Sequence, residues 1–212
     1  MLAARLLLAT RSPDKLREIR QLLAPPVQLE LLTLQQLGIE PVPAEDDVET
    51  FPTFRENALA KAQYFQRLTG LAVLADDSGI EVDALDGAPG VRSRRFAARP
   101  GLDGRDLDLA NNRLLLERLQ GVPEEERTAR YVCAAVLLTP DGLATTALGT
   151  CGGRVLEEPR GTAGFGYDPL FLVPGTGRSF GEIDPADKAR FSHRARAIRA
   201  LRPRALALSP RT

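Results

Sequence analysis

The 212-residue chain has little of several residue types, and each shortage excludes a class of site. Its two cysteines, Cys133 and Cys151, are too few for a disulfide framework or a cysteine-rich metal knuckle. Its single histidine, His193, cannot supply a polyhistidine zinc site. No apolar run approaches the ~18–20 residues of a membrane span, and the first residues lack the apolar region of a signal peptide. We therefore expect a cytoplasmic chain without a membrane partner.

An excess of charge of one sign is also missing. The 28 Lys+Arg residues balance 28 Asp+Glu residues, and this zero net charge argues against a general nucleic-acid partner. The length predicts one domain over residues 1–212, and 43% hydrophobic residues exclude a disordered chain. All but three basic residues are arginines, so Lys15, Lys61 and Lys188 are candidates for positions that need a compact ammonium group.

Common catalytic and nucleotide-binding motifs are absent as well. No Gly-x-x-x-x-Gly-Lys-Ser/Thr sequence occurs, which excludes a P-loop protein. Gly161-x-x-Gly164-x-Gly166 does not open a helix and is not a dinucleotide-binding fingerprint. A serine hydrolase of the α/β type would need a Gly-x-Ser-x-Gly elbow, which is missing.

Alternating strand and helix signals predict an α/β fold with a mixed sheet and helices on its faces. Residues 5–9 are typical of a buried strand, and Ser12 and Pro13 begin a helix that Pro25-Pro26 ends. A capping box, Thr53 to Glu56, begins the second helix. The other expected elements are strands at 27–33 and 71–75, a helix at 107–120, a hairpin at 129–139 and 143–150, and a last helix from Ser192 that Pro203 ends or kinks.

The most suggestive segment is Asp76-Asp77-Ser78-Gly79, which follows the apolar run 71–75. We expect it at the carboxyl end of that strand, where open α/β sheets bind ligands. One aspartate would face a cleft and the other would brace the loop, because adjacent strand residues point to opposite faces. Mg²⁺ binds such carboxylates together with substrate phosphates. The alternative is a turn with an aspartate cap.

Four further segments are candidates for contact with substrate or metal. Lys15 and Lys61 lie early in helices, where an ammonium group adds to the helix dipole at a phosphate site; exposed helix lysines are the alternative. The acidic, proline-rich loop 41–52 supplies a second metal ligand or is simply a solvated loop. Phe165-Gly166-Tyr167-Asp168 offers aromatic faces for a base and a carboxylate for its N–H groups, or forms a glycine-rich turn with buried aromatics.

In this order along the chain, the motifs resemble one family over residues ~5 to ~201. They are Thr10…Lys15…Glu18, Thr53-Phe54-x-Glu56-Asn57-Ala58-x-x-Lys61, Asp76-Asp77-Ser78-Gly79…Gly87-Ala88-Pro89-Gly90, Gly164-Phe165-Gly166-Tyr167-Asp168-Pro169, and Lys188 with Ser192-His193-Arg194. The chain resembles the Ham1/RdgB-type non-canonical purine nucleoside triphosphate pyrophosphatases, the inosine triphosphatases. The resemblance implies an elongated α/β homodimer with a cleft between two lobes. It also implies Mg²⁺-dependent hydrolysis of ITP, dITP and XTP to the monophosphate and pyrophosphate.

The resemblance also implies roles for particular residues. Asp77 is the proton acceptor and, with Glu49, a metal ligand, and Lys61 is catalytic at the phosphates. The substrate-binding residues are Thr10, Arg11, Ser12, Lys15, Ser78, Phe165, Gly166, Tyr167, Asp168, Lys188, His193 and Arg194.

One departure from the family pattern is clear. The family usually has Thr-Gly-Asn-x-x-Lys, whereas this chain has Thr10-Arg11-Ser12-x-x-Lys15. Arg11 removes the close backbone approach that glycine permits, although its guanidinium could contact phosphate itself. Two other functions remain open: a Maf-like pyrophosphatase acting on other nucleotides, and a nucleotide-binding module without catalysis.

Overall fold

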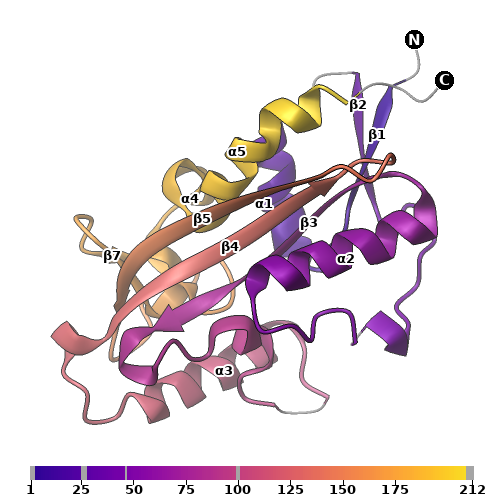
Figure 1. The fold of residues 1–212 in the computed structure, drawn as a ribbon. Coiled ribbons are helices and arrows are strands. Elements are labelled where there is room, and N and C mark those ends of the chain that lie inside the picture. The colour runs from indigo at the N-terminus through magenta and orange to yellow at the C-terminus, as the bar shows by residue number, and fades with distance from the viewer. Residues whose placement is uncertain (1–2, 25–27, 46, 99–100, 209–212) are drawn as a thin grey trace. The chain divides into compact units, whose positions relative to one another are not determined.

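A mixed β-sheet organises the chain in its computed structural model, which describes residues 3–24, 28–45, 47–98 and 101–208 (Figure 1). The strands are β1 (Ala4–Leu8), β2 (Leu29–Thr33), β3 (Ala72–Val82), β4 (Thr128–Leu138), β5 (Ala144–Val155), β6 (Phe171–Val173) and β7 (Arg178–Ser179). Their order across the sheet is β2-β1-β3-β4-β5-β6-β7. β1 is parallel to β2 and β3, whereas β6 is antiparallel to β5 and β7. The predicted mixed α/β architecture is therefore confirmed.

Helices accompany these strands along the chain. The α-helices are α1 (Pro13–Leu23), α2 (Phe54–Thr69), α3 (Gly104–Arg118), α4 (Pro185–Phe191) and α5 (His193–Leu206). The short 3-10 helices are η1 (Pro43–Glu45), η2 (Asp83–Leu85), η3 (Gly90–Arg95), η4 (Glu124–Glu126), η5 (Asp168–Leu170) and η6 (Phe180–Glu182).

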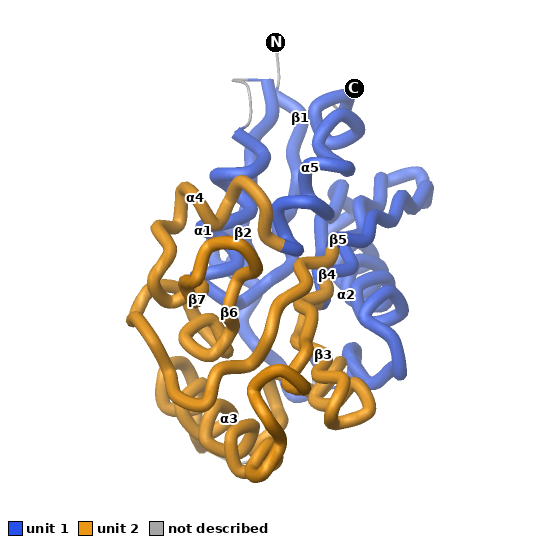
Figure 2. The backbone as a smooth tube through the Cα atoms, turned by 90° about the vertical axis from the view of Figure 1, so that its left-hand side faces the viewer, with its two compact units in different colours: residues 1–77, 133–149, 193–212 blue, residues 78–132, 150–192 orange. Residues whose placement is uncertain are grey.

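Internal contacts divide the chain into two compact units (Figure 2). Unit 1 comprises residues 1–77, 133–149 and 193–212, and unit 2 comprises residues 78–132 and 150–192. Strands β3, β4 and β5 each contribute residues to both units. The single domain over residues 1–212 and the cleft between lobes both stay predictions.

In unit 1, β1 lies between β2 and β3. The chain therefore crosses the sheet in one direction from β1 to β2 and in the other from β2 to β3. Because parallel crossovers are right-handed, α1 and α2 cover opposite faces of these strands. Helix α5 packs against α1, and Figure 1 shows both on the side away from α2.

The predicted starts of the first two helices are confirmed. The hydroxyl of Ser12 accepts a hydrogen bond from the backbone N–H of Lys15 at 3.3 Å, which caps α1. The hydroxyl of Thr53 accepts one from the N–H of Glu56 at 3.2 Å, which caps α2. Pro25-Pro26, which we expected to end the first helix, lies outside the described residues.

The third strand is longer than predicted. The apolar run predicted a strand at 71–75 followed by a ligand loop or a turn, but β3 continues to Val82. The Asp76–Gly79 motif therefore lies in the middle of β3, and both expectations for its backbone were wrong. A buried strand tolerates two carboxylates here because cations from distant elements neutralise them, as described below.

The rest of the chain differs from the prediction in three ways. Pro203 lies inside α5 and does not end it, because its missing N–H affects only the last turns of the helix. Helix α3 spans Gly104–Arg118 instead of 107–120. Helix α4 and the strand pair β6 and β7 were not predicted as such, because segments this short show no hydrophobic periodicity.

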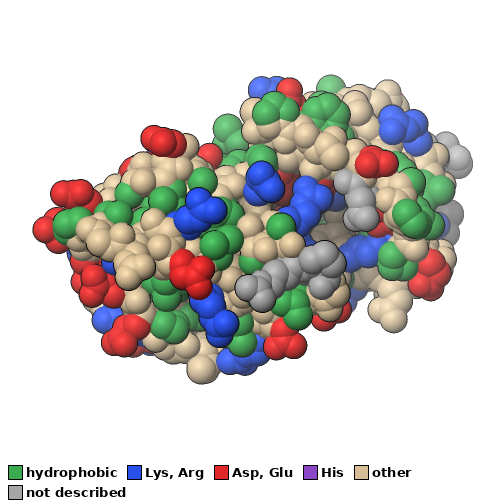
Figure 3. Space-filling view, turned by 90° about the horizontal axis from the view of Figure 1, so that it is seen from below, with side chains coloured by type: hydrophobic (Ala, Val, Ile, Leu, Met, Phe, Trp, Pro, Cys, Tyr) green, Lys and Arg blue, Asp and Glu red, His purple; other side chains and the backbone are tan. Residues whose placement is uncertain are grey.

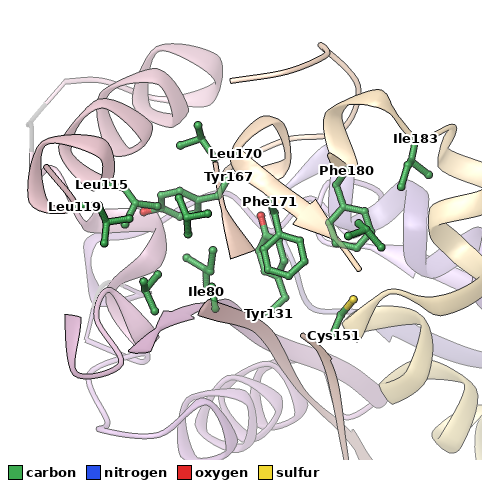
Figure 4. Packing of buried hydrophobic residues seen from close by; sticks show 14 residues of the cluster. Ile80, Leu115, Leu119, Tyr131, Cys151, Tyr167, Leu170, Phe171, Phe180 and Ile183 are labelled. Carbon is green, nitrogen blue, oxygen red and sulfur yellow. The ribbon is translucent and has the colours of Figure 1, made fainter. Parts of the chain in front are cut away.

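The core of unit 2 combines aliphatic side chains with a cluster of aromatic rings (Figure 4). The Phe171 and Phe180 rings stack with centroids 5.3 Å apart, and Tyr131 packs against Phe171 at 4.7 Å. The Tyr167 hydroxyl donates to the Ser93 carbonyl at 2.8 Å, which joins the core to η3. Cys151 lies in this core and Cys133 is also buried, and neither forms a disulfide, so both are small buried residues as predicted.

Side chains of both charge signs, Lys and Arg as well as Asp and Glu, lie on the face seen in Figure 3. This distribution agrees with the zero net charge of the chain. Among the described residues, no helix combines the length and the apolar character needed to cross a bilayer.

Gly79 provides a test of how β3 and η3 pack. A Cβ atom at this position would overlap the Ser93 hydroxyl and the Gly90 carbonyl, while that hydroxyl accepts the Ile80 N–H at 2.9 Å. We expect Gly79→Ala to destabilise the protein by about 1–3 kcal/mol through overpacking. Thermal unfolding measures this loss, and Gly152→Ala on β5, where a Cβ meets open space, is the matched control. Equal melting temperatures for the two variants would contradict this packing.

Candidate active site

Asp76 and Asp77 lie side by side in β3, and their side chains point to opposite faces because neighbouring strand residues alternate. Asp76 is fully buried. Its Oδ2 lies 3.2 Å from Lys15 Nζ and 3.2 Å from Arg194 Nε. Burial alone would raise its pKa, but Lys15, Arg194 and Lys61 outweigh burial and hold the pKa well below its ordinary value. Asp76 is therefore a buried, ionised anchor for cations from α1 and α5.

The His193-Arg194 segment at the start of α5 is also buried. Arg194 donates to Glu18 at 2.5 Å as well as to Asp76. Burial tends to lower its pKa, but these two carboxylates raise the pKa above its ordinary value. The His193 carbonyl approaches Gly149 so closely that a side chain there has no room. Within unit 1 this segment fixes α5 to its neighbours, and its expected contact with a nucleoside stays a prediction.

Lys61 extends from the middle of α2, and its ammonium pairs with the Glu49 carboxylate. Its burial would lower its pKa, but Glu49, Asp76 and Asp77 raise it, so the side chain stays charged. The prediction that Lys61 lies early in a helix was wrong, because α2 begins about two turns earlier, at Phe54. The helix dipole therefore does not explain its place. Lys61 is instead a cation paired with Glu49 and stabilised electrostatically by Asp76 and Asp77.

Asp77 is nearly buried but is less fully compensated than Asp76. Its Oδ2 accepts one hydrogen bond from Asn57 Nδ2 at 3.0 Å. Burial raises its pKa, Lys15 and Lys61 lower it, and the net direction is upward from the ordinary value of an aspartate. A buried carboxylate with a raised pKa is suited to accept a proton.

Asn57 is a structural partner of the site that the sequence prediction missed. It is 1% exposed and lies on the inner face of α2. Besides its bond to Asp77, its Nδ2 donates to the Phe51 carbonyl at 3.2 Å and its Oδ1 accepts the Phe51 N–H at 2.8 Å. Asn57 thus joins Asp77 to the end of the acidic loop. The signal that could have revealed it is a polar residue in the apolar stripe of an amphipathic helix.

The expected phosphate-side loop connects β1 to α1. Thr10 is buried, and its hydroxyl accepts the Ser12 N–H at 3.2 Å. Lys15, in the first turn of α1, is held by Asp76, as described above. The loop and the start of α1 thus carry two hydroxyls and an ammonium, a set of donors suited to phosphate. The Arg11 side chain points away from this set and toward Glu45.

In unit 2, Asp168 organises the glycine-rich loop. It is 1% exposed, and its Oδ2 accepts the Phe165 N–H at 2.9 Å. The same oxygen lies 2.5 Å from Lys188 Nζ. A Cβ atom on Gly164 would overlap this carboxylate, so the turn requires glycine there. The structure of this loop agrees in large part with the alternative interpretation, a glycine-rich turn with buried aromatic side chains.

Lys188 lies in α4 and is itself buried. Its ammonium lies 5.0 Å from the centroid of the Phe165 ring and 5.2 Å from that of the Phe180 ring, within the range of cation–π attraction. Gly166 is fixed by Asp108, whose carboxylate accepts its N–H at 2.8 Å. The loop around Phe165 is therefore a preorganised aromatic and cationic platform.

The structure thus gathers the predicted residues in two sets, one in each unit. Unit 1 holds Thr10, Arg11, Ser12, Lys15, Glu49, Lys61, Asp77, His193 and Arg194. Unit 2 holds Ser78, Phe165, Gly166, Tyr167, Asp168 and Lys188.

Known proteins of similar sequence cover nearly the whole chain. The Ham1 family matches residues 6–204. A dITP/XTP pyrophosphatase of Thermus thermophilus is 48% identical over 197 residues, which are 93% of this chain and 89% of that protein. A dITP/XTP pyrophosphatase of Nocardia farcinica is 44% identical over 213 residues and 100% of both chains.

Solved structures agree. The HAM1 protein of Coxiella burnetii superimposes with a TM-score of 0.82 at 33% identity, over 98% of this chain and 100% of that one. The dITP/XTP pyrophosphatase of Mycobacterium abscessus gives a TM-score of 0.71 at 41% identity, over 93% and 98% of the two chains.

Proposed function

Because this chain belongs to the Ham1 family, we propose that it hydrolyses non-canonical purine nucleoside triphosphates, namely ITP, dITP and XTP, to the monophosphate and pyrophosphate. Its relatives at 44–48% identity are named dITP/XTP pyrophosphatases and align over nearly all of its length. It is thus a hydrolase that acts on acid anhydrides and removes deaminated purines from the nucleotide pool. The observation that carries the proposal is the buried Asp77 carboxylate of unit 1, which Asn57 joins to the loop whose Glu49 pairs with Lys61.

In this proposal Asp77 accepts a proton from the water that attacks the α-phosphorus. Its raised pKa supports this role, because a general base is most effective when its pKa lies near the operating pH. Lys15 and Lys61 stabilise the charge that develops on the phosphate oxygens. A preorganised donor of this kind typically contributes ~3–4 kcal/mol to the transition state.

We also propose Mg²⁺ as the cofactor, held by Glu49 and Asp77. The described residues contain no group of three or more His, Cys, Asp or Glu side chains placed to hold a metal alone. The two carboxylates of Glu49 and Asp77 fit Mg²⁺, because this ion binds one or two protein carboxylates and fills its remaining coordination positions with water and substrate phosphates. When bound, the ion would neutralise charge on the phosphate oxygens.

On the base side, we propose that the Phe165 ring stacks on the purine and that Gly166, Tyr167, Asp168 and Lys188 shape its surroundings. Hypoxanthine and xanthine carry a 6-oxo acceptor where adenine carries a 6-amino donor. A protein donor facing that position would be left unpaired by adenine, at a cost of ~1–3 kcal/mol. We further expect a cytoplasmic homodimer.

A nucleotide panel tests this proposal. We expect the kcat/KM for ITP and XTP, measured as pyrophosphate release with Mg²⁺, to exceed that for ATP at least about tenfold. GTP keeps the 6-oxo group, so its value reports on recognition around position 2. Equal values for all four purines would contradict the proposed selectivity.

The same panel separates the other two functions. Preferred hydrolysis of TTP or UTP would indicate a Maf-like pyrophosphatase. Tight binding of ITP without pyrophosphate release would indicate a nucleotide-binding module.

A further inference from the structure

Arg11, which stands where the family usually has glycine, uses every nitrogen of its guanidinium within unit 1. Nε donates to Glu45 Oε2 at 2.8 Å, and Nη2 donates to Glu45 Oε1 at 2.6 Å. Nη1 donates to the Ile39 carbonyl at 2.9 Å. The carboxylate contact is bidentate, which is the strongest geometry available to an Arg–Glu pair. Its hydrogen bonds to Glu45 raise the pKa of Arg11 from its ordinary value.

The segment that Arg11 contacts lies at the surface of the protein. None of the described residues from 40 to 50 is buried. The backbone hydrogen bonds at Glu45 and Val48 are local, to Val42 and to Glu45 itself. A loop without core contacts opens at low free-energy cost, so a tether from a neighbouring element matters.

This segment carries Glu49, and its other end is already fixed to the site. Lys61 pairs with the Glu49 carboxylate, and Asn57 holds both backbone groups of Phe51. Arg11 supplies the corresponding tie at the beginning of the segment. The loop is therefore attached at Glu45 and at Phe51, and Glu49 lies between these two positions.

We propose that Arg11 is a positioning residue, which through Glu45 holds the loop so that Glu49 stays opposite Lys61 and binds the divalent cation. This inference rests on the proposed function, because it takes Glu49 as a metal ligand. It replaces the expectation that Arg11 contacts phosphate, since such a contact would require breaking the pair with Glu45. The loop clamp, defined as Arg11 with Glu45 and Ile39, thus acts on metal affinity and not on the chemical step.

The test compares Arg11→Ala, Glu45→Gln and the exchange Arg11→Glu with Glu45→Arg. We expect each single variant to raise the Mg²⁺ concentration for half-maximal activity about tenfold, since each breaks charge-assisted hydrogen bonds, while kcat at saturating Mg²⁺ changes little. The exchange variant should recover a large part of this loss. Arg17→Ala is the matched control, because Arg17 pairs only with Asp14 on the exposed side of the same helix among the described contacts.

A second readout needs neither metal nor nucleotide. Hydrogen–deuterium exchange in EDTA should be faster in peptides covering residues 39–49 for both single variants, and near normal for the exchange variant. If Glu45→Gln leaves exchange and Mg²⁺ dependence unchanged while Arg11→Ala alone raises KM, Arg11 contacts phosphate and the clamp is refuted. Failure of the unmodified protein to hydrolyse ITP would instead refute the proposed function, and the exchange data would still decide whether the clamp exists.

Discussion

Replacing Asp77 by asparagine is expected to lower kcat for ITP about a thousandfold or more. The side chains have nearly the same shape, so the change removes the proton acceptor and its charge without opening a cavity. General base catalysis alone typically contributes ~10²–10⁴-fold, and loss of a metal-binding carboxylate adds to it. Pyrophosphate release under saturating ITP and Mg²⁺ measures the effect.

The fold of this variant must be checked, because Asp77 accepts a hydrogen bond from Asn57. Circular dichroism and thermal unfolding should show a folded protein. Asp86→Asn is the matched control: Asp86 is exposed and has a φ of 52°, a conformation that asparagine accepts readily, so activity should be unchanged. Turnover of Asp77→Asn near that of the control would remove Asp77 from the mechanism.

Replacing Arg194 by methionine is expected to cause the largest loss of stability. The guanidinium is 1% exposed and neutralises Asp76 and Glu18, so methionine leaves one fully buried carboxylate with fewer cations. Breaking a buried ion pair by removing one partner costs ~3–5 kcal/mol. For a chain of this size each kcal/mol lowers Tm by ~2–4 °C, so we expect a decrease of roughly 6–20 °C in a calorimetric scan.

Two further variants show whether the uncompensated carboxylate causes this loss of stability. Arg204→Met changes an exposed arginine on the same helix and should leave Tm nearly unchanged. Adding Asp76→Asn to Arg194→Met removes the stranded carboxylate and should recover part of the loss. If Arg194→Met unfolds at the normal temperature but loses affinity for ITP, its main role is nucleoside binding and not support of β3.

Local chemistry explains which elements the sequence predicts well. Ser12 and Thr53 cap their helices through hydrogen bonds to residues three positions away, so the signal and its consequence lie within one turn. The hairpin between β4 and β5 likewise follows from Pro140-Asp141-Gly142, where Gly142 has a φ of 90°. Such features depend on a few adjacent residues and are visible without the fold.

The extent of β3 could not be predicted in this way. The carboxylate of Asp76 is tolerated in a buried strand only because Lys15 and Arg194 reach it from α1 and α5. Arg194 lies 118 positions after Asp76 in the chain. No local pattern indicates that these cations neutralise Asp76, so the sequence predicts that the strand ends at the charged residues.

The site was predicted as a set of residues, mainly through the family resemblance, but not as a network. Asn57 belongs to one of the motifs that carry the resemblance, but its contacts, which join Asp77 to the loop that carries Glu49, were not predicted. Arg11 was expected at phosphate, whereas it binds Glu45, which is 34 positions away. Both are long-range polar contacts, which depend on how loops fold back and not on residue type.

The central claim is that water attacks the α-phosphorus of a non-canonical purine triphosphate and pyrophosphate leaves. Hydrolysis of ITP in ¹⁸O-labelled water, followed by mass spectrometry of the products, tests it most directly. The proposal predicts IMP carrying one ¹⁸O atom and unlabelled pyrophosphate in equal amounts. Labelled orthophosphate together with IDP would show attack at the terminal phosphorus and would contradict it.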